Sequence, residues 1–238
     1  MKGLLALIDE RTAAFEKLPL YAFMADDRVA PEARLAFVPA LAHFVMSFAD
    51  LYGFVLRDEP ARDPFQELVN AHTHEDGGHW RWFLADLAAL GHDPAVRFSD
   101  ALRFTFGPST TKTRLLTYRM CRLGLGATSL QKLVLVHCIE ATGRVSLRSA
   151  SAVSRAVAAR TGKRLVYFGP HHFETESDHT LERDDVRASL ESVVVDAEMR
   201  AALRAVIDDA FDAFTAFADD LARFAQHPVA IGEAATRS

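Results

Sequence analysis

Apolar residues recur every three or four positions along most of this 238-residue chain. The clearest case lies near the C-terminus, where one helical face would carry Leu203, Ile207, Ala210, Phe214, Phe217, Leu221 and Phe224. This spacing is typical of an amphipathic α-helix, and no stretch alternates apolar and polar residues for long enough to indicate a strand. The sequence therefore predicts an all-α fold.

The same periodicity predicts further helices, and their ends carry the usual signals. Pro31 opens a long segment in which Pro39 predicts a kink, and Gly91 ends the segment that begins at residue 64. Other helices are predicted over residues 3–17, 109–123 and 127–160, followed by the non-helical link "RLVYFGP". Without repeats or a Gly-, Pro- or Ser-rich linker, we expect one domain, residues 1–238, as a bundle of about seven helices.

The charge pattern excludes some classes of partner. The net charge is −5 and the basic residues are scattered, so the chain has no general attraction for nucleic acid or anionic lipid. The N-terminus does not fit a signal peptide, and no run reaches the ~20 apolar residues of a membrane span. Cys121 and Cys138 lie in apolar helical patterns and are expected to be reduced thiols. We expect a cytoplasmic protein that binds no nucleic acid and no membrane.

The stretch "HHFETESDHTLE", residues 171–182, is rich in histidine and acids and contains no Lys or Arg. On a helix, His172, Glu176 and His179 stand at positions i, i+4 and i+7 and share one face. A solvated charged surface would explain them, and so would one wall of a metal site.

Two other predicted helices supply potential metal ligands. His72 and His79 are seven residues apart, and His137 and Glu140 are three apart. Glu140 stands in the apolar run "LVLVHCIEATG", where a carboxylate is costly to bury unless something positive neutralises it. An ion pair with Arg144 would do so, and so would a metal. Imidazole and carboxylate ligands suit iron, manganese and zinc, and several helices can present them in a bundle core.

These residues resemble the pattern of the heme-oxygenase-like di-iron oxidases, over residues 30 to 225 or so. In that superfamily one helix carries an acid and a His seven apart, and a later helix carries a lone Glu. A final helix carries His, acid and His. The matching positions here are His79, Glu140, His172, Glu176 and His179. The resemblance implies a heme-oxygenase-like bundle that holds two Fe(II) ions per chain and uses O2 as co-substrate.

One position departs from the pattern, because His72 stands where the superfamily has an acid. Either His72 itself binds iron, or Glu75 or Asp76 completes the site, with Gly77 and Gly78 allowing the helix to open locally. A neutral ligand in place of a carboxylate removes one negative charge, so we expect the second iron to be labile.

The resemblance also implies a reaction class. The expected substrate is a small molecule with a carboxylate or an amine, most simply an amino acid that is oxidatively rearranged or decarboxylated. The stretch "HFVMSFADLYGFVLRDE" is similar to a branch that converts a tryptophan-type amino acid to a nitrile. Glu140 is the expected catalytic carboxylate that bridges both metals. Substrate contacts are expected from Arg144, Asp50, Phe44 and Ser47, and we expect a homodimer.

Other functions remain open from the sequence. A fatty-acid oxidative decarboxylase would use the same scaffold and metals. A thiaminase-like hydrolase would need no metal and would use Cys138 as nucleophile, although its apolar neighbours argue against a thiolate. The ligands could also form a metal site without turnover. A ferritin-like protein would need paired Glu-x-x-His motifs, and the chain offers only "ESDH" and the near-match "DGGH".

Overall fold

The computed structural model describes residues 1–76, 78–177, 184–229 and 231–232, and it is helical without any strand over these residues. The all-α prediction is confirmed. The α-helices are α1 (Lys2–Phe15), α2 (Pro19–Met24), α3 (Pro31–Arg34), α4 (Ala42–Asp50), α5 (Pro64–Glu75), α6 (Trp80–Leu90), α7 (Phe98–Phe106), α8 (Thr111–Gly124), α9 (Ser129–Thr161), α10 (Pro170–Ser177), α11 (Asp184–Ser192) and α12 (Ala197–Gln226). Two 3-10 helices, η1 (Val38–Leu41) and η3 (Pro108–Thr110), and a π-helix, η2 (Leu51–Leu56), complete the elements.

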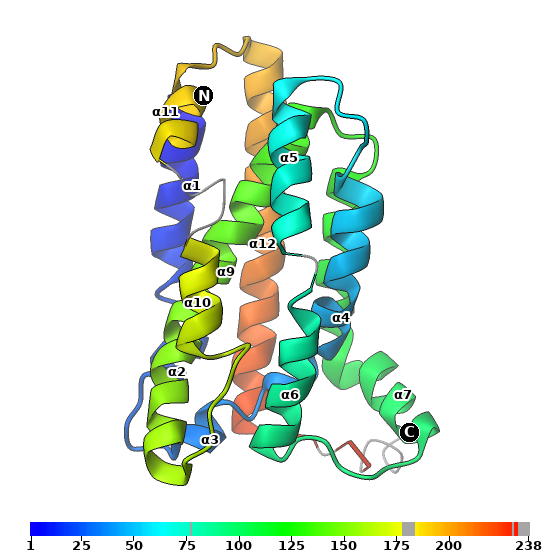
Figure 1. The fold of residues 1–238 in the computed structure, drawn as a ribbon, viewed down its shortest axis with the longest axis vertical. Coiled ribbons are helices and arrows are strands. Elements are labelled where there is room, and N and C mark those ends of the chain that lie inside the picture. Colours follow the sequence, from blue (N-terminus) through cyan, green and yellow to red (C-terminus); the bar gives the residue numbers. More distant parts are fainter. Residues whose placement is uncertain (77, 178–183, 230, 233–238) are drawn as a thin grey trace.

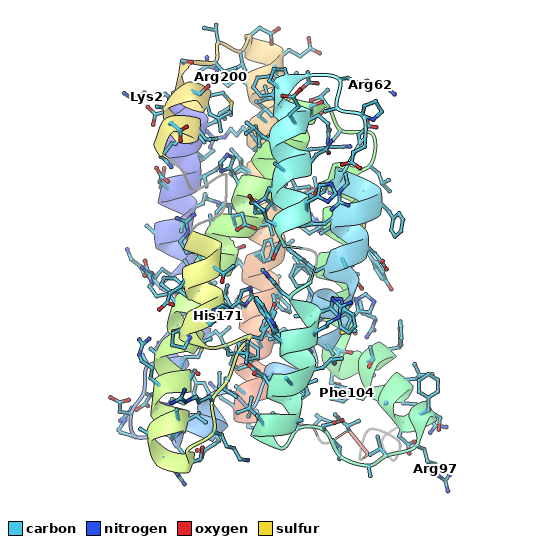
Figure 2. All side chains as sticks on the ribbon, in the orientation of Figure 1. Lys2, Arg62, Arg97, Phe104, His171 and Arg200 are labelled. Carbon is cyan, nitrogen blue, oxygen red and sulfur yellow. The ribbon has the colours of Figure 1, made fainter. Side chains whose placement is uncertain are left out.

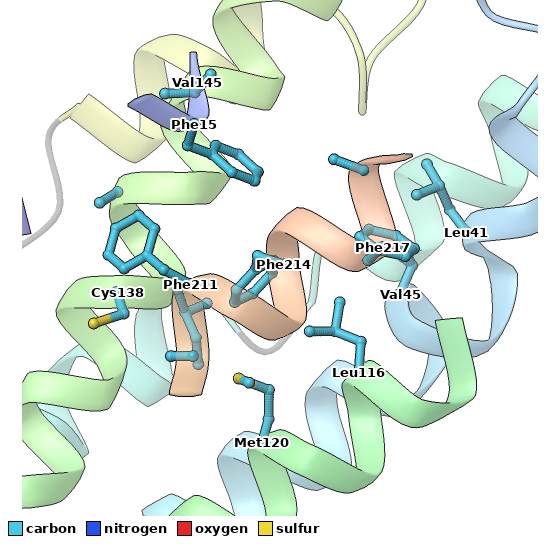
Figure 3. Close-up of a cluster of buried hydrophobic side chains, with 14 of the residues drawn as sticks. Phe15, Leu41, Val45, Leu116, Met120, Cys138, Val145, Phe211, Phe214 and Phe217 are labelled. Carbon is cyan, nitrogen blue, oxygen red and sulfur yellow. The ribbon is translucent and has the colours of Figure 1, made fainter. Parts of the chain in front are cut away.

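The long helices α9 and α12 form the centre of the bundle. Figure 1 shows them running side by side, with α1 and α5 along their flanks, and α9 contacts all three. The apolar stripe predicted on α12 is buried along its whole length. In the close-up of Figure 3, Phe211, Phe214 and Phe217 of α12 point among Phe15 of α1 and Leu116 of α8. This layer is the core on which the rest of the bundle packs.

Local sequence explains where these helices begin and end. Asp63 precedes α5, and its carboxylate accepts hydrogen bonds from the backbone N–H groups of Phe65 and Gln66. Thr128 caps α9 through a reciprocal pair of bonds with Gln131, and Gly162 ends that helix at a φ of 74°. Each such N-cap stabilises its helix by about 1 kcal/mol.

Two segments that were predicted as continuous helices are broken. The segment from Pro31 divides into α3, η1, α4 and η2. Pro39 lacks a backbone donor and stands in the 3-10 turn between α3 and α4, and α4 continues directly into the π-helix η2. The segment from residue 64 divides into α5 and α6, which are separated at Asp76 to His79, and Gly91 ends α6 as predicted. The bundle therefore has more and shorter helices than the seven expected.

The first of these broken segments, Pro31–Leu56, is long and apolar enough by composition to cross a membrane. Core helices of soluble proteins often meet the same criterion, and 44% of its most apolar window is buried inside the bundle. It is an exception to the expectation that no run is apolar enough to span a membrane. The cytoplasmic location stays a prediction.

Candidate metal centre

Among the residues that the structure describes, buried histidines and carboxylates meet in two groups that could each hold a metal ion. We call them the His72 cluster (His72, Asp76 and Glu140) and the His172 cluster (Asp76, His79 and His172). Within each group the potential ligand atoms lie within 4.8 Å of one another. Asp76 belongs to both groups, so one carboxylate stands between two potential metal positions, whereas Glu140, the expected bridge, belongs to the His72 cluster.

The His72 cluster joins the last turn of α5 to the interior of α9. His72 Nε2 lies 3.0 Å from Glu140 Oε1, and the His72 side chain is fully buried. The hydroxyl of Tyr52, in the π-helix η2, donates to Glu140 Oε1 at 3.2 Å and lies 3.3 Å from His72 Nε2. An imidazole and a carboxylate at this distance share a proton in the absence of a metal. A divalent ion would take the place of that proton.

The His172 cluster joins the end of α5, the start of α6 and the first turn of α10. His79 Nδ1 lies 2.5 Å from Asp76 Oδ1 and 3.0 Å from His172 Nε2. His172 Nδ1 donates to the backbone carbonyl of Tyr167 at 2.8 Å, because a carbonyl can only accept. This bond fixes the tautomer, so the lone pair of His172 Nε2 faces the cluster, as in many metal-ligating histidines.

The break between α5 and α6 places Asp76 in the centre. Asp76 is the C-cap of α5 and is buried, whereas the side chain of Glu75 is about one third exposed, with a carboxylate oxygen 3.9 Å from His72 Nδ1. Of the two acids that the sequence left open, the structure brings Asp76 into the site. Asp76 and His79 are three residues apart and flank the break, at the end of α5 and the start of α6.

A further layer of contacts holds His172 in place. The carboxylate of Asp86, on α6, accepts hydrogen bonds from the backbone N–H groups of Val166 at 2.7 Å and Phe168 at 2.9 Å. These bonds fix the link that presents the Tyr167 carbonyl to His172. Burial nevertheless raises the pKa of the Asp86 carboxyl above its ordinary value. The ring of Trp82 stacks on His79, with centroids 4.4 Å apart.

The chemistry of the donor set fits a pair of divalent metal ions. Three imidazoles and two carboxylates converge, and all five side chains are buried. Buried carboxylates are costly unless positive charge neutralises them, and two divalent ions would supply it. The mixture of nitrogen and oxygen donors suits iron, manganese or zinc and does not by itself select among them.

A cavity of about 140 Å³ opens against both clusters. Asp76, His79, Glu140 and His172 contribute to its wall, and most of the remaining lining is apolar or aromatic. Phe44, expected to contact substrate, lines this cavity, as does Trp80. The arrangement is a polar cluster at the side of an apolar chamber, which is the usual form of a small-molecule site.

The other expected substrate contacts lie elsewhere. Ser47 is half-buried and Asp50 is exposed, and neither belongs to the described lining of the cavity. Arg144 is exposed and lines a second cavity of about 210 Å³ together with His137, on a different face of α9 from Glu140. Four residues rotate the side chain by only about 40° around the helix, so the packing of the neighbouring helices, and not the spacing, assigns Glu140 and Arg144 to different cavities.

Two of the six expected metal ligands cannot be placed. Glu176 belongs to the last turn of α10, but its side chain lies outside the described residues, and so does all of His179. The neighbouring His171, labelled in Figure 2, is exposed on α10, while His172 faces the core. The face predicted for His172 is therefore the inward face of this helix.

Sequence reasoning missed Tyr52 and Asp86, which contact or orient the ligands. Tyr52 stands in an apolar run and resembles any core aromatic residue. Asp86 offered a weak signal, because it interrupts the apolar stretch "WFLADLAAL". An acid in such a position needs partners, but the sequence does not say that they are backbone N–H groups eighty residues away.

Comparison with known proteins adds nothing to this geometry: neither a protein-family model nor a curated protein matches the chain.

Proposed function

We propose that this protein is a non-heme di-iron oxidase that uses O2 to oxidise a small substrate carrying a carboxylate or an amine, most simply an amino acid. The observation that carries the proposal is the shared position of Asp76 between two buried clusters of ligands. A single metal needs only one such group. A carboxylate common to two groups supports a site for two ions, held close together.

The composition of the two clusters is compatible with iron, and their arrangement on several helices of a bundle favours it. Sites that combine histidine with carboxylates on several helices of a bundle commonly hold two iron ions. When bound, two Fe(II) ions would supply the site of O2 activation and two of the electrons that reduce O2. His72 and Glu140 would hold one ion, His79 and His172 the other, and Asp76 would contact both. Glu176 and His179 stay predicted ligands.

The chain's own residues would control the substrate. The lining of the cavity leaves little polar surface away from the clusters, so a substrate would place its polar head near the metals and its apolar part among the aromatic side chains. The same lining excludes water from the reacting end, which strengthens electrostatic interactions there. Tyr52 holds its proton toward Glu140 Oε1 and would keep that carboxylate oriented.

Anaerobic titration with Fe(II) followed by exposure to O2 tests the proposal. We expect about two ions per chain and rapid O2 consumption that depends on a substrate amino acid. A protein that binds no iron, or binds it without any O2 uptake across a panel of amino acids and fatty acids, would contradict the proposal. The Asp76→Ala variant is the matched control, because it lacks the shared carboxylate.

One further candidate function has an observation in its favour. The mostly apolar cavity would also accept the chain of a fatty acid, as a fatty-acid oxidative decarboxylase requires. The substrate panel separates the two candidate functions.

The thiaminase-like alternative depends on Cys138. Burial raises the pKa of the Cys138 thiol far above its usual range, and Cys138 is fully buried in the core of Figure 3. A thiaminase-like role for this cysteine is therefore not supported.

A further inference from the structure

The cavity has a second polar feature at a distance from the metal clusters. Tyr21 of α2 and Ser146 of α9 both line it, and their hydroxyl oxygens lie 2.9 Å apart. Ser146 stands six residues after Glu140, which corresponds to about 9 Å along the helix axis. The pair therefore lies further along the α9 wall, away from the metal ligand Glu140.

The hydrogen bonds of this pair fix the direction of the protons. Ser146 Oγ has one proton, and it is directed to the backbone carbonyl of Thr142 at 2.9 Å. The proton between the two hydroxyls must then come from Tyr21, so Tyr21 donates and Ser146 accepts. Burial raises the pKa of the Tyr21 hydroxyl above its ordinary value, which keeps the phenol protonated. The Tyr21 oxygen can therefore accept a further hydrogen bond, but it has no second proton to donate.

Other polar side chains in the described lining are less suited than Tyr21 to accept a hydrogen bond from a ligand at this end of the cavity. Thr142, also in the lining, donates its hydroxyl to the helix carbonyls of Cys138 and Ile139. Trp80 and Tyr167 belong to the metal end, since Trp80 follows His79 and the Tyr167 ring lies 4.7 Å from His172.

The wall between the two ends is open. Gly143 lies one turn from Glu140 and one turn from Ser146 and lines the cavity, and a Cβ placed there would meet nothing within 4 Å. A ligand can therefore extend along α9 from the metal ligands to Tyr21 without meeting a side chain from this position.

We propose that Tyr21, positioned by Ser146, is a specificity-determining residue that accepts a hydrogen bond from a donor at the far end of the substrate. The substrate class would be aromatic amino acids that carry an N–H or O–H donor on the ring, opposite the carboxylate and amine. The aromatic rings of the lining favour an aromatic body over an aliphatic one. This inference rests on the proposed function, because it places the polar head of the substrate at the metal clusters.

The test compares two ligands of nearly equal size. L-4-aminophenylalanine carries a ring donor, and L-4-methylphenylalanine carries a methyl group in its place. Affinities for the Fe(II)-loaded protein are measured anaerobically by calorimetry and repeated on the metal-free protein. We expect the wild-type protein to bind the amino compound about fivefold more tightly than the methyl compound, because one hydrogen bond in a buried site has about this value.

The Tyr21→Phe variant should reverse the preference. It keeps the ring and removes the acceptor, so the amino group would be buried without a partner and the methyl compound would bind more tightly. Tyr118→Phe makes the same chemical change at an exposed tyrosine and should keep the wild-type preference. A wild-type preference for the methyl compound would overturn the inference, as would a Tyr21→Phe variant that still prefers the amino compound.

Failure of this inference is distinguishable from failure of the proposed function. If neither ligand binds at millimolar concentration, the inference is overturned, whatever the iron and O2 measurements give. If the preference reverses in Tyr21→Phe but no O2 is consumed, the inference stands and the oxidase function fails. The wild-type comparison needs no variant, so a folding defect in Tyr21→Phe would not remove the test.

Discussion

The two clusters share Asp76 but are supported in different ways. The His72 cluster draws Glu140 from the interior of α9, where the backbone hydrogen bonds of a long helix hold it, and His72 from the last turn of α5. The His172 cluster is built at helix ends: His79 is the N-cap of α6, and His172 stands in the first turn of α10. Helix ends have fewer intrahelical bonds and open more readily.

The clusters also differ in charge. Among the described ligands, the His72 cluster has two carboxylates and one imidazole, whereas the His172 cluster has one carboxylate and two imidazoles. The sequence motivated a labile second iron by a missing carboxylate at His72, but Asp76 supplies one to that cluster. The position of the ligands on the helices and the number of carboxylates therefore both predict that the His72 cluster binds its metal ion more tightly than the His172 cluster. Four substitutions test this prediction.

Removing the shared carboxylate should have the largest effect. Asp76→Ala takes a ligand from both clusters, so we expect the affinity for both metal ions to fall by more than about 100-fold. Anaerobic Fe(II) titration measures the loss. Glu75→Ala, at the neighbouring and partly exposed acid, should bind as the wild type does. A loss in Glu75→Ala together with wild-type binding in Asp76→Ala would mean that Glu75, not Asp76, completes the site.

Glu140→Ala should affect one half selectively. It removes a carboxylate from the His72 cluster and leaves all the ligands of the His172 cluster, so we expect the stoichiometry to fall from two ions toward one and O2 consumption to stop. The fold should persist, because a buried charge is removed and no apolar contact is lost from the α12 stripe. Thermal unfolding and metal analysis check both points. Retained turnover would contradict the role of Glu140.

Asp86→Ala tests the support of the other half. The N–H groups of Val166 and Phe168 would lose their acceptor, which should cost about 1–3 kcal/mol of stability. The Tyr167 carbonyl would then hold His172 less firmly, and we expect the affinity of the His172 cluster to fall about 10–100-fold. Asp93→Ala, at an exposed acid after α6, is the control. A loss of metal affinity at the His72 cluster, with the His172 cluster unchanged, would contradict the role of Asp86 in supporting His172.

Tyr52→Phe should have the smallest effect. It removes one donor from Glu140 but leaves the helical support of the His72 cluster, so we expect less than about a tenfold loss of affinity there and about 1 kcal/mol of stability. Tyr118→Phe again serves as the exposed control. A loss as large as that of Glu140→Ala would show that the hydroxyl, more than the helices, holds this cluster.

Prediction from the sequence succeeded where a property is local. The apolar stripe of α12, the start of α5, the end of α6 at Gly91 and the extent of α9 to within two residues follow from the sequence, and the structure confirms them. Histidine and acid at helical spacing also indicated His72, His79, Glu140 and His172, which the structure brings together.

Prediction was weaker where a property depends on a break in a helix. Glycines between His72 and His79 suggested local opening, but the choice of Asp76 over Glu75 needed the geometry of the break.

Arg144 was expected beside the substrate because it follows Glu140 by four residues, but it lines the second cavity. The packing of the neighbouring helices decides which side of α9 faces each cavity, and the spacing of two residues along the helix does not reveal it.

The sequence by itself determined that the chain is helical and which residue types each helix face presents, because those properties depend on neighbours within a few positions. Only the tertiary structure decided that α5 and α9 bring His72 to Glu140, that Asp76 is shared, and that Tyr21 and Ser146 stand further along the α9 wall of the cavity. These contacts join residues dozens of positions apart, and they form because burying the apolar faces of the helices fixes which polar side chains meet.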